Sequence, residues 1–240
     1  MKRTIIWFSG GVPSAVAGKI TLDKYPDAIP VFIDTHSEEK DLYRFLDDIQ
    51  NWYGKEIIRL SSNKYTSVDD VVTKTKYMSG IAGARCTLEL KKKVRFAFQQ
   101  VDDIHVFGYT IDNRDFRRAI RFVENNFELI LYFPLVNKGY TKKDCFNVIE
   151  EVGITIPYMY RINYDNNNCP GCLKVTSPWY WDKIRTDFPD IFNTRSEQGR
   201  RLNVRLVIYK GKRIFLDELP AGITFKKQKS ESCDFLCGKG

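Results

Sequence analysis

Long apolar runs are missing from this 240-residue chain. No stretch approaches the roughly 18 consecutive apolar residues that a membrane-spanning helix needs. The segment after Met1-Lys2-Arg3 is apolar for only a few residues and breaks at Gly10-Gly11, which is too short for the core of a signal peptide. We therefore expect a cytoplasmic protein without a membrane partner, and we interpret the first apolar run as a buried strand.

Histidine is scarce, and no lysine-rich tail or arginine block marks a dedicated nucleic-acid-binding segment. The two histidines are His36, in a loop, and His105, in a predicted strand where we expect a structural role. The chain nevertheless carries 38 Lys and Arg against 30 Asp and Glu, a formal charge of +8. Such a balance favours anionic partners, namely nucleotides, nucleic acids or acidic proteins.

Internal repeats and low-complexity linkers are also absent, which leaves a globular chain with one sizeable core. Short apolar runs alternate with amphipathic segments over the first 133 residues. The runs predict strands at 5–8, 29–33, 56–60, 104–108 and 129–133, and the segments between them predict helices at 14–25, 39–52, 88–99 and 114–125 and one that opens at Ser67. This alternation predicts an α/β fold, a Rossmann-like doubly wound, mainly parallel five-stranded sheet.

After residue 134 the character of the sequence changes. Thr141 and Asp144 resemble a capping box that opens a helix ending near Val152. A hairpin is predicted at 205–216, turning at Lys210-Gly211. We expect residues 1–160 to form the ligand-binding domain and residues 161–240 to form a cysteine-containing cap packed on it.

Three polar loops directly follow predicted strands, and in such sheets ligands sit beyond the carboxyl ends of the strands. They are Ser9-Gly10-Gly11, Asp34-Thr35-His36 and Gly108-Tyr109-Thr110. In the first loop the glycines allow backbone N–H groups to approach phosphate, and the following helix adds its positive N-terminus. Ser9 and Ser14 offer hydroxyl donors, so this loop is the predicted phosphate site.

The wider pattern resembles the phosphoadenosine phosphosulfate (PAPS) reductase family of the adenine nucleotide alpha-hydrolase-like, or PP-loop, superfamily. Ser9-Gly10-Gly11-x-x-Ser14 is similar to the PP-loop Ser-Gly-Gly-x-Asp-Ser, and Asp34-Thr35 is similar to a signature of the reductase branch. Other similar segments follow in family order: Arg85-Cys86-Thr87, Leu90-Lys91, Gly108 to Asp112, Arg117-Arg118, Phe133-Pro134-Leu135, Thr141, Asp144, Ile156-Pro157 and Tyr160. The Asn-Asn-Asn-Cys-x-Gly-Cys loop resembles PAPS reductase-like proteins often carried by bacteriophages.

The resemblance implies an adenine nucleotide ligand, which is PAPS, adenylylsulfate or ATP. The implied nucleotide contacts are Ser9, Gly10, Gly11, Ser14, Asp34, Thr35, Lys91, Gly108, Arg117 and Arg118. Pro13 stands where the PP-loop has Asp, and Thr110 stands where the family often has Arg. The first departure removes a carboxylate that would help to hold magnesium, so it weakens the expectation of ATP cleavage more than that of nucleotide binding.

Six cysteines stand at positions 86, 145, 169, 172, 233 and 237. Without a secretory signal, clustered cysteines favour metal binding or redox chemistry over a disulfide framework. Cys169-x-x-Cys172 places two thiols on one turn, which is the usual half-site for zinc or an iron–sulfur cluster. Cys145 lies in an amphipathic segment and is expected in the core.

Three assignments of the remaining cysteines stay open. A structural zinc would use Cys169, Cys172, Cys233 and Cys237, whereas a [4Fe–4S] cluster would use Cys86, Cys169 and Cys172 with a fourth ligand or an open iron. The second set resembles the clusters of adenylylsulfate reductases and some thiolation enzymes. In the third assignment Cys233 or Cys237 is the catalytic thiol, because the tail is faintly similar to the Glu-Cys-Gly tail of the reductases.

Three functions follow as alternatives. The first is thiol-dependent reduction of PAPS or adenylylsulfate to sulfite and nucleotide, with a reductant such as thioredoxin and a homodimer as implied partners. The second is ATP-dependent adenylation and thiolation of a nucleobase or nucleic acid. The third is a non-catalytic nucleotide-sensing or partner-binding module with a structural zinc.

Overall fold

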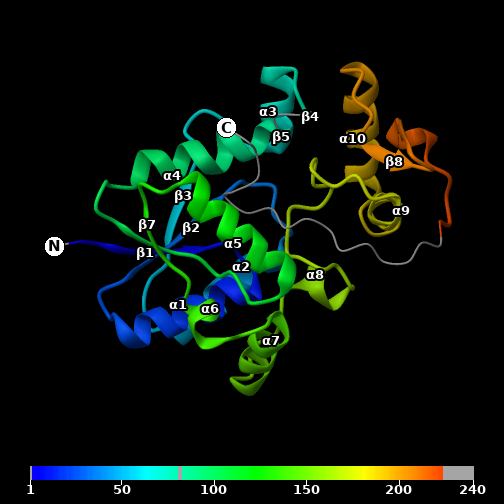
Figure 1. Cartoon of the computed structure of the whole chain (residues 1–240). Coiled ribbons are helices and arrows are strands. Elements are labelled where there is room, and N and C mark those ends of the chain that lie inside the picture. Colours follow the sequence, from blue (N-terminus) through cyan, green and yellow to red (C-terminus); the bar gives the residue numbers. More distant parts are fainter. Residues whose placement is uncertain (1, 81–82, 224–240) are drawn as a thin grey trace. The chain divides into compact units, whose positions relative to one another are not determined.

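The computed structural model describes residues 2–80 and 83–223, which fall into two compact units (Figure 1). The described residues of Met1–Ile33, Lys40–Leu60 and Arg95–Asn163 form unit 1. Those of Asp34–Glu39, Ser61–Val94 and Tyr164–Gly240 form unit 2. The expected packing of residues 161–240 on residues 1–160 stays a prediction.

A five-stranded parallel sheet forms the centre of unit 1, which confirms the predicted α/β fold. Its strands are β1 (Thr4–Phe8), β2 (Ile29–Asp34), β3 (Ile58–Ser61), β6 (Ile104–Val106) and β7 (Ile130–Tyr132). Their order is β3-β2-β1-β6-β7. All five lie within two residues of the predicted strands, because a parallel sheet covered on both faces needs continuous apolar strands that stand out in the sequence.

Helices cover both faces of this sheet (Figure 1). The helices that lie wholly within unit 1 are α1 (Val12–Lys24), α2 (Asp41–Tyr53), α5 (Asn113–Asn125), α6 (Pro134–Lys138), α7 (Lys142–Glu151) and α8 (Tyr158–Arg161). On one face Phe8 packs into a core with Phe45 of α2 and Ile149 of α7. On the other face Trp7 meets Phe98 edge-on, with ring centroids 6.1 Å apart.

The strand order places a topological switch point between β1 and β6. The chain runs outward from β1 through β2 to β3 and then returns to the other side of β1 with β6 and β7. Ligands of doubly wound sheets bind at such a point, outside the carboxyl ends of the strands. A ligand site is therefore expected at the loops that follow β1 and β6.

Unit 2 is mostly helical. Its elements are α3 (Val68–Thr75), β4 (Ser79–Gly80), β5 (Gly83–Ala84), the π-helix η1 (Thr87–Lys92), α9 (Pro178–Asp187), α10 (Pro189–Arg201), β8 (Val207–Tyr209), β9 (Lys212–Ile214) and η2 (Leu216–Glu218). The predicted hairpin is confirmed, and Lys210 and Gly211 at its turn have φ angles of 47° and 77°. Paired positive φ angles of this kind are typical of a type I′ turn.

One predicted helix differs from its observed form. The sequence predicts a single helix over 88–99, whereas the chain winds as η1 and then as α4 (Lys93–Phe98). Within six residues the apolar spacing of a π-turn cannot be told from that of an α-helix, so the pattern does not reveal it. Among the described residues, no helix is both long and apolar enough to cross a membrane.

Candidate nucleotide and thiol sites

The loop between β1 and α1 is held in shape by one hydroxyl. Ser14 Oγ accepts hydrogen bonds from Ser9 N at 3.1 Å and from Ser9 Oγ at 3.0 Å, and it donates to Gly11 O at 2.8 Å. Gly10 has a φ of +81°, and a Cβ there would lie 2.6 Å from a methyl group of Leu42. Both serines therefore bond within the loop, and the glycine is required by backbone conformation and by space.

Pro13 lies in the first turn of α1, as expected from its tolerance at that position. It has no N–H, so this helix start offers phosphate one donor fewer than a loop with Asp would. No acidic residue stands in the first turn of α1. The start of α1 thus has neither the carboxylate nor the amide that Asp at position 13 would supply.

Gly108, directly beyond β6, packs against the start of α1. A Cβ on Gly108 would lie 2.6 Å from Ser14 Cα and 2.7 Å from Ser14 N. These are backbone atoms that cannot swing away, so only glycine fits. Gly108 therefore allows the segment after β6 to approach the start of α1.

Tyr160 of α8 lies over the same loop, although its position in the sequence does not predict a role at this site. A Cβ on Gly11 would be 3.1 Å from the Tyr160 hydroxyl. The Tyr160 ring packs edge-on against Phe146 with centroids 5.0 Å apart, and Lys142 Nζ lies 5.2 Å from the ring centroid. The Tyr160 hydroxyl therefore lies close to Gly11 of the loop, and the Lys142 ammonium group lies beside the Tyr160 ring.

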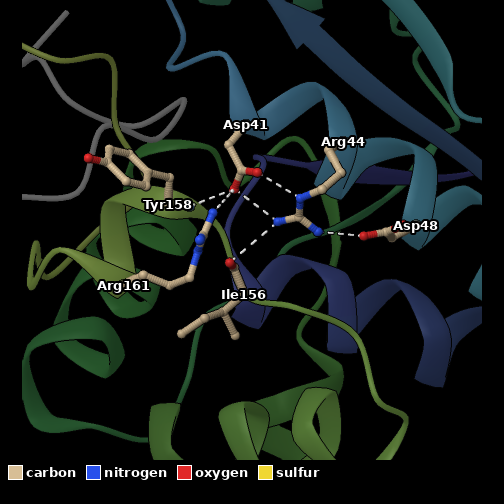
Figure 2. A network of polar contacts seen from close by, with 6 residues as sticks. All are labelled: Asp41, Arg44, Asp48, Ile156, Tyr158 and Arg161. Atoms are coloured by element: carbon tan, nitrogen blue, oxygen red, sulfur yellow. Dashed lines mark hydrogen bonds and ion pairs between the residues drawn. The ribbon is translucent and has the colours of Figure 1, made fainter.

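A network of charged groups fixes the segment that carries Tyr160 (Figure 2). Asp41, at the start of α2, binds the Arg44 guanidinium through both carboxylate oxygens, at 2.7 and 2.9 Å. The same carboxylate accepts from Tyr158 N at 2.7 Å and lies 3.1 Å from Arg161 Nη2. The Arg44 pair outweighs the opposing effect of burial and lowers the pKa of Asp41 to about 2. Asp41 thus anchors α8 to α2 as a carboxylate.

The polar and charged residues that follow β6 bond to one another within that segment. Thr110 Oγ1 donates to Asp112 at 3.1 Å and to Asp115 at 3.2 Å. Arg118 pairs with Asp115 at 2.8 Å and lies 5.4 Å above the Tyr109 ring. The expected phosphate contact from Arg118 would therefore compete with Asp115.

The structure also gives the positions of Arg117, a predicted nucleotide contact, and of the predicted capping box. Arg117 lies on the exposed side of α5. The capping box of α7 is confirmed, with Thr141 and Asp144 bonded reciprocally. It sets the position of Lys142, whose backbone N–H donates to Asp112 at 2.8 Å.

The second candidate site lies in unit 2 and centres on Glu38, a residue that no sequence motif predicts. Its side chain is 4% exposed and accepts from Thr35 Oγ1 at 2.9 Å and from Cys169 Sγ at 3.4 Å. Thr35 Oγ1 also lies 3.4 Å from that sulfur, and Lys91 Nζ lies 3.8 Å from Glu38. The structure therefore gathers two predicted nucleotide contacts and one predicted metal ligand around a single buried carboxylate.

The remaining loop residues bond locally. Asp34 Oδ1 accepts from the backbone of His36 at 2.7 Å, and His36 has a positive φ of 52°. Asp34 therefore supports the turn itself, and the helix cap of α2 is a different residue, Lys40.

Cys86 is the N-cap of the π-helix η1, and Lys91 lies within its last turn. Buried Glu89 on the same helix lies 2.9 Å from Arg85 and 2.8 Å from Lys93. Wide turns of this kind are rare and occur frequently at functional sites. Lys91 lies in η1, so the wide turn of this helix sets the position of its side chain beside Glu38.

The Cys169-Pro170-Gly171-Cys172 loop is held from two helices. Cys172 N donates to the Tyr180 hydroxyl of α9 at 2.9 Å, and Arg195 of α10 donates to Gly171 O at 3.3 Å. Gly171 has a φ of +66°, and a Cβ there would lie 2.5 Å from Ile191. These contacts fix the conformation of the loop, and both of its cysteines are buried.

The metal assignments are tested only in part by these positions. Among the described residues, no three His, Cys, Asp or Glu side chains come together in a group that could hold a metal ion. Cys233 and Cys237, predicted as ligands or as the catalytic thiol, lie outside the described residues. The zinc and [4Fe–4S] sites therefore stay predictions, and no chemical step is assigned to either. Cys145 is fully buried, as expected, and burial raises its pKa to about 12.

Comparison with known proteins bears on the fold. No family model and no curated protein matches the chain. Among solved structures it is similar to the PAPS reductase of Candida auris in a phosphate complex, with a TM-score of 0.51 and 12% identity over 70% of this chain and 82% of that one. At this identity the similarity shows the fold alone, which is a PAPS reductase-like α/β fold.

Proposed function

We propose that this chain is an adenine-nucleotide-binding enzyme of the PAPS reductase type, with the nucleotide phosphates over the Ser9–Ser14 loop. The observation that carries the proposal is the approach of Gly108 to Ser14, which closes a glycine-rich strand–helix turn at the switch point of the sheet. The similar fold of a reductase whose structure is a phosphate complex supports it. Tyr160 and Lys142 are the proposed polar contacts to phosphate on the side of α8 and α7.

The proposed reaction is reduction of PAPS or adenylylsulfate. A cysteine thiolate attacks the sulfonate sulfur, the sulfur–oxygen bond to the nucleotide breaks, and the nucleotide leaves with its phosphate. A second thiol, from the chain or from a thioredoxin-like reductant, then attacks the modified cysteine and releases sulfite, leaving a disulfide. The thiolate is the reactive form, and adjacent Lys or Arg favours it.

Three cysteines are candidates for the thiol. Cys233 and Cys237 are the candidates from the sequence. Cys169 is a candidate from the Glu38 cluster, because its thiol donates to the Glu38 carboxylate at 3.4 Å, which places a proton acceptor beside the sulfur.

Calorimetry with PAPS, adenylylsulfate and ATP tests the nucleotide site. We expect one of the sulfated nucleotides to bind, and absence of binding by all three would contradict the proposal. Tyr160→Phe removes one hydroxyl and should weaken binding about five- to tenfold, which is the effect of one hydrogen bond to a charged group. Tyr158→Phe is the matched control, because only the backbone of Tyr158 enters the Asp41 network.

Sulfite release, measured under reducing conditions, tests which cysteine is the nucleophile. Serine variants of Cys169, Cys233 and Cys237 are compared one at a time, and the nucleophile is the cysteine whose loss abolishes release while nucleotide binding persists. Full activity in all three variants would exclude these three cysteines as the nucleophile.

The second candidate function is ATP-dependent thiolation of a nucleic acid, which the charge of +8 favours. Binding of ATP with no affinity for PAPS or adenylylsulfate would select it. The absence of an acidic residue from the first turn of α1 makes it the weaker candidate, since no carboxylate there assists magnesium. A non-catalytic nucleotide sensor with a structural zinc would bind nucleotide, contain zinc and release no sulfite.

A further inference from the structure

One positive charge in the interior of unit 1 has no polar partner among the described residues. Arg95 of α4 is 1% exposed, and its Nε and Nη1 atoms are buried without a hydrogen bond. Two aromatic rings lie against it, with its Cζ 4.9 Å from the centroid of Phe96 and 5.8 Å from that of Phe122. Burial has removed the hydration of this guanidinium without providing a counter-charge, which is a costly arrangement.

The carboxylates of this region do not pair with Arg95. Asp103, which follows α4, is buried, but its two oxygens bind Arg3 at 2.8 and 2.7 Å. Glu128 is exposed. Burial lowers the pKa of Arg95 from 12.5 to about 10, against opposing effects of Tyr109 and Glu128. Arg95 therefore stays charged at neutral pH and forms no ion pair within residues 2–80 and 83–223.

A second group without a partner lies near this charge. His105 of β6 is fully buried, and its Nδ1 accepts from Trp7 Nε1 at 3.0 Å. Its Nε2 bonds to none of the described residues. A neutral imidazole carries its proton on the nitrogen that does not accept, so Nε2 is an N–H donor. The charge of Arg95 contributes to the low pKa of His105, which indicates that the two groups lie within interaction range.

Ring contacts hold these groups on one face of the sheet, the face that carries Trp7. Trp7 meets Phe98 of α4 with ring centroids 6.1 Å apart. Phe107, two residues after His105 and therefore on the same face, meets Phe122 of α5 with centroids 4.9 Å apart. Phe122 is also one of the two rings against the guanidinium, so α4, α5 and β6 together enclose the unpartnered donors.

We propose that Arg95 and His105 bind a small monovalent anion of about the size of chloride. The N–H groups of Arg95 Nε and Nη1 and of His105 Nε2 donate to it. Gln99, one turn along α4 from Arg95, has a buried Oε1 without a partner in the described chain, and rotation of its amide presents a further N–H. One cation and a neutral imidazole balance one negative charge. A sulfate or a doubly charged phosphate would remain uncompensated in this apolar enclosure.

This anion site is separate from the loop proposed to bind nucleotide. His105 pairs in register with Ile5 inside the sheet, whereas the Ser9–Ser14 loop begins beyond the carboxyl end of β1. The anion therefore has a structural role, because it supplies the counter-charge for Arg95. It should stabilise the folded chain in the manner of any ligand that binds only the native state.

Thermal unfolding of the full chain tests the proposal. Chloride replaces gluconate stepwise at constant ionic strength, because gluconate is a monoanion too bulky for an enclosed site. For a dissociation constant of ~10 mM, the Tm of the wild type should rise by about 4–8 °C up to ~300 mM chloride. Bromide should have a similar effect.

Two variants separate a bound anion from a general effect of salt. Arg95→Met removes the buried cation, so its Tm should not respond to chloride. In gluconate it should be at least as stable as the wild type, since the uncompensated charge is gone. Arg59→Met is the matched control, because it removes an exposed cation of unit 1 that pairs with Asp47. Its Tm should respond to chloride as that of the wild type does.

Crystals of the wild type grown in bromide locate the ion without any variant. We expect an anomalous peak within hydrogen-bonding distance of Arg95 and of His105 Nε2. A wild-type Tm that is equal in chloride and gluconate would overturn the proposal and would leave water as the partner of both groups. A chloride response that Arg95→Met retains in full, or bromide peaks only at other places, would also overturn it.

Discussion

At the scale of single residues, the turn between β1 and α1 is the feature that the sequence reveals best. Ser9, Gly10, Gly11 and Ser14 stand together in the chain, and the loop they predict is observed. Glu38 was not predicted, because its contact with Cys169 joins residues 131 positions apart. Periodicity and local motifs describe neighbours in sequence, and contacts of this kind depend on the folded chain.

Replacing Gly108 by Ala should damage the loop. The new Cβ meets Ser14 backbone at 2.6 Å, so α1 or β6 must shift. We expect a loss of about 1–3 kcal/mol in unfolding free energy, as for other overpacked sites, and weaker nucleotide binding. Urea denaturation and calorimetry measure the two effects. Gly153→Asn is the control, since Gly153 has a φ of +71° with nothing near its Cβ position and Asn tolerates that conformation. Wild-type affinity in the Gly108 variant would contradict the assigned role.

His105 should make the protein sensitive to moderate acid. It is fully buried and its Nδ1 accepts from Trp7 Nε1 at 3.0 Å. Burial, assisted by Arg95, lowers its pKa from 6.5 to about 4. Between these values the unfolded chain binds the proton and the folded chain does not, so stability falls as pH drops from 6.5 to 4, by about 3 kcal/mol in total.

The variant that tests this is His105→Gln, which retains an acceptor for Trp7 but does not titrate. Its unfolding free energy should vary less with pH between 6.5 and 4 than that of the wild type. Parallel curves for the two proteins would show that His105 is not the group responsible.

At the scale of elements, the five strands and the capped helix α7 were predictable because burial and capping leave local patterns. The π-turn of η1 and the anchoring of α8 were not. α8 has only four residues, Tyr158–Arg161, and too few positions to show a period. Its place depends on Asp41, which begins a helix more than 100 residues earlier.

Asp41→Asn should therefore loosen α8 in a manner that depends on pH. The Arg44 pair lowers the pKa of Asp41 from 3.8 to about 2. The stabilisation is complete above about pH 4 and is lost as pH falls to 2. After allowance for solvent screening, we expect the variant to lose about 1–2 kcal/mol of unfolding free energy at neutral pH. The unfolding free energies of wild type and variant, measured by urea denaturation, should converge near pH 2. Asp23→Asn, which removes only the exposed pair with Lys19, should have little effect, and an equal effect would contradict the prediction.

At the scale of the whole molecule, the charge of +8 predicts two kinds of anion binding that salt should separate. Diffuse attraction of single-stranded RNA should fade as salt rises from ~50 to ~300 mM, because screening and ion competition remove it. Binding at a preformed loop should decline less. Fluorescence anisotropy and calorimetry over that range measure both, and RNA binding that resists salt would support the nucleic-acid alternative.

The approach of Gly108 to Ser14 also constrains how this protein can be changed. The Ser9–Ser14 loop and the segment after β6 form one fitted pair, although nearly 100 residues of chain lie between them. A loop transplanted from another nucleotide-binding protein, for example to restore Asp at position 13, will fit only if the donor helix begins at the same distance from this glycine. Attempts to convert one chemistry into another on this scaffold should therefore exchange both segments together.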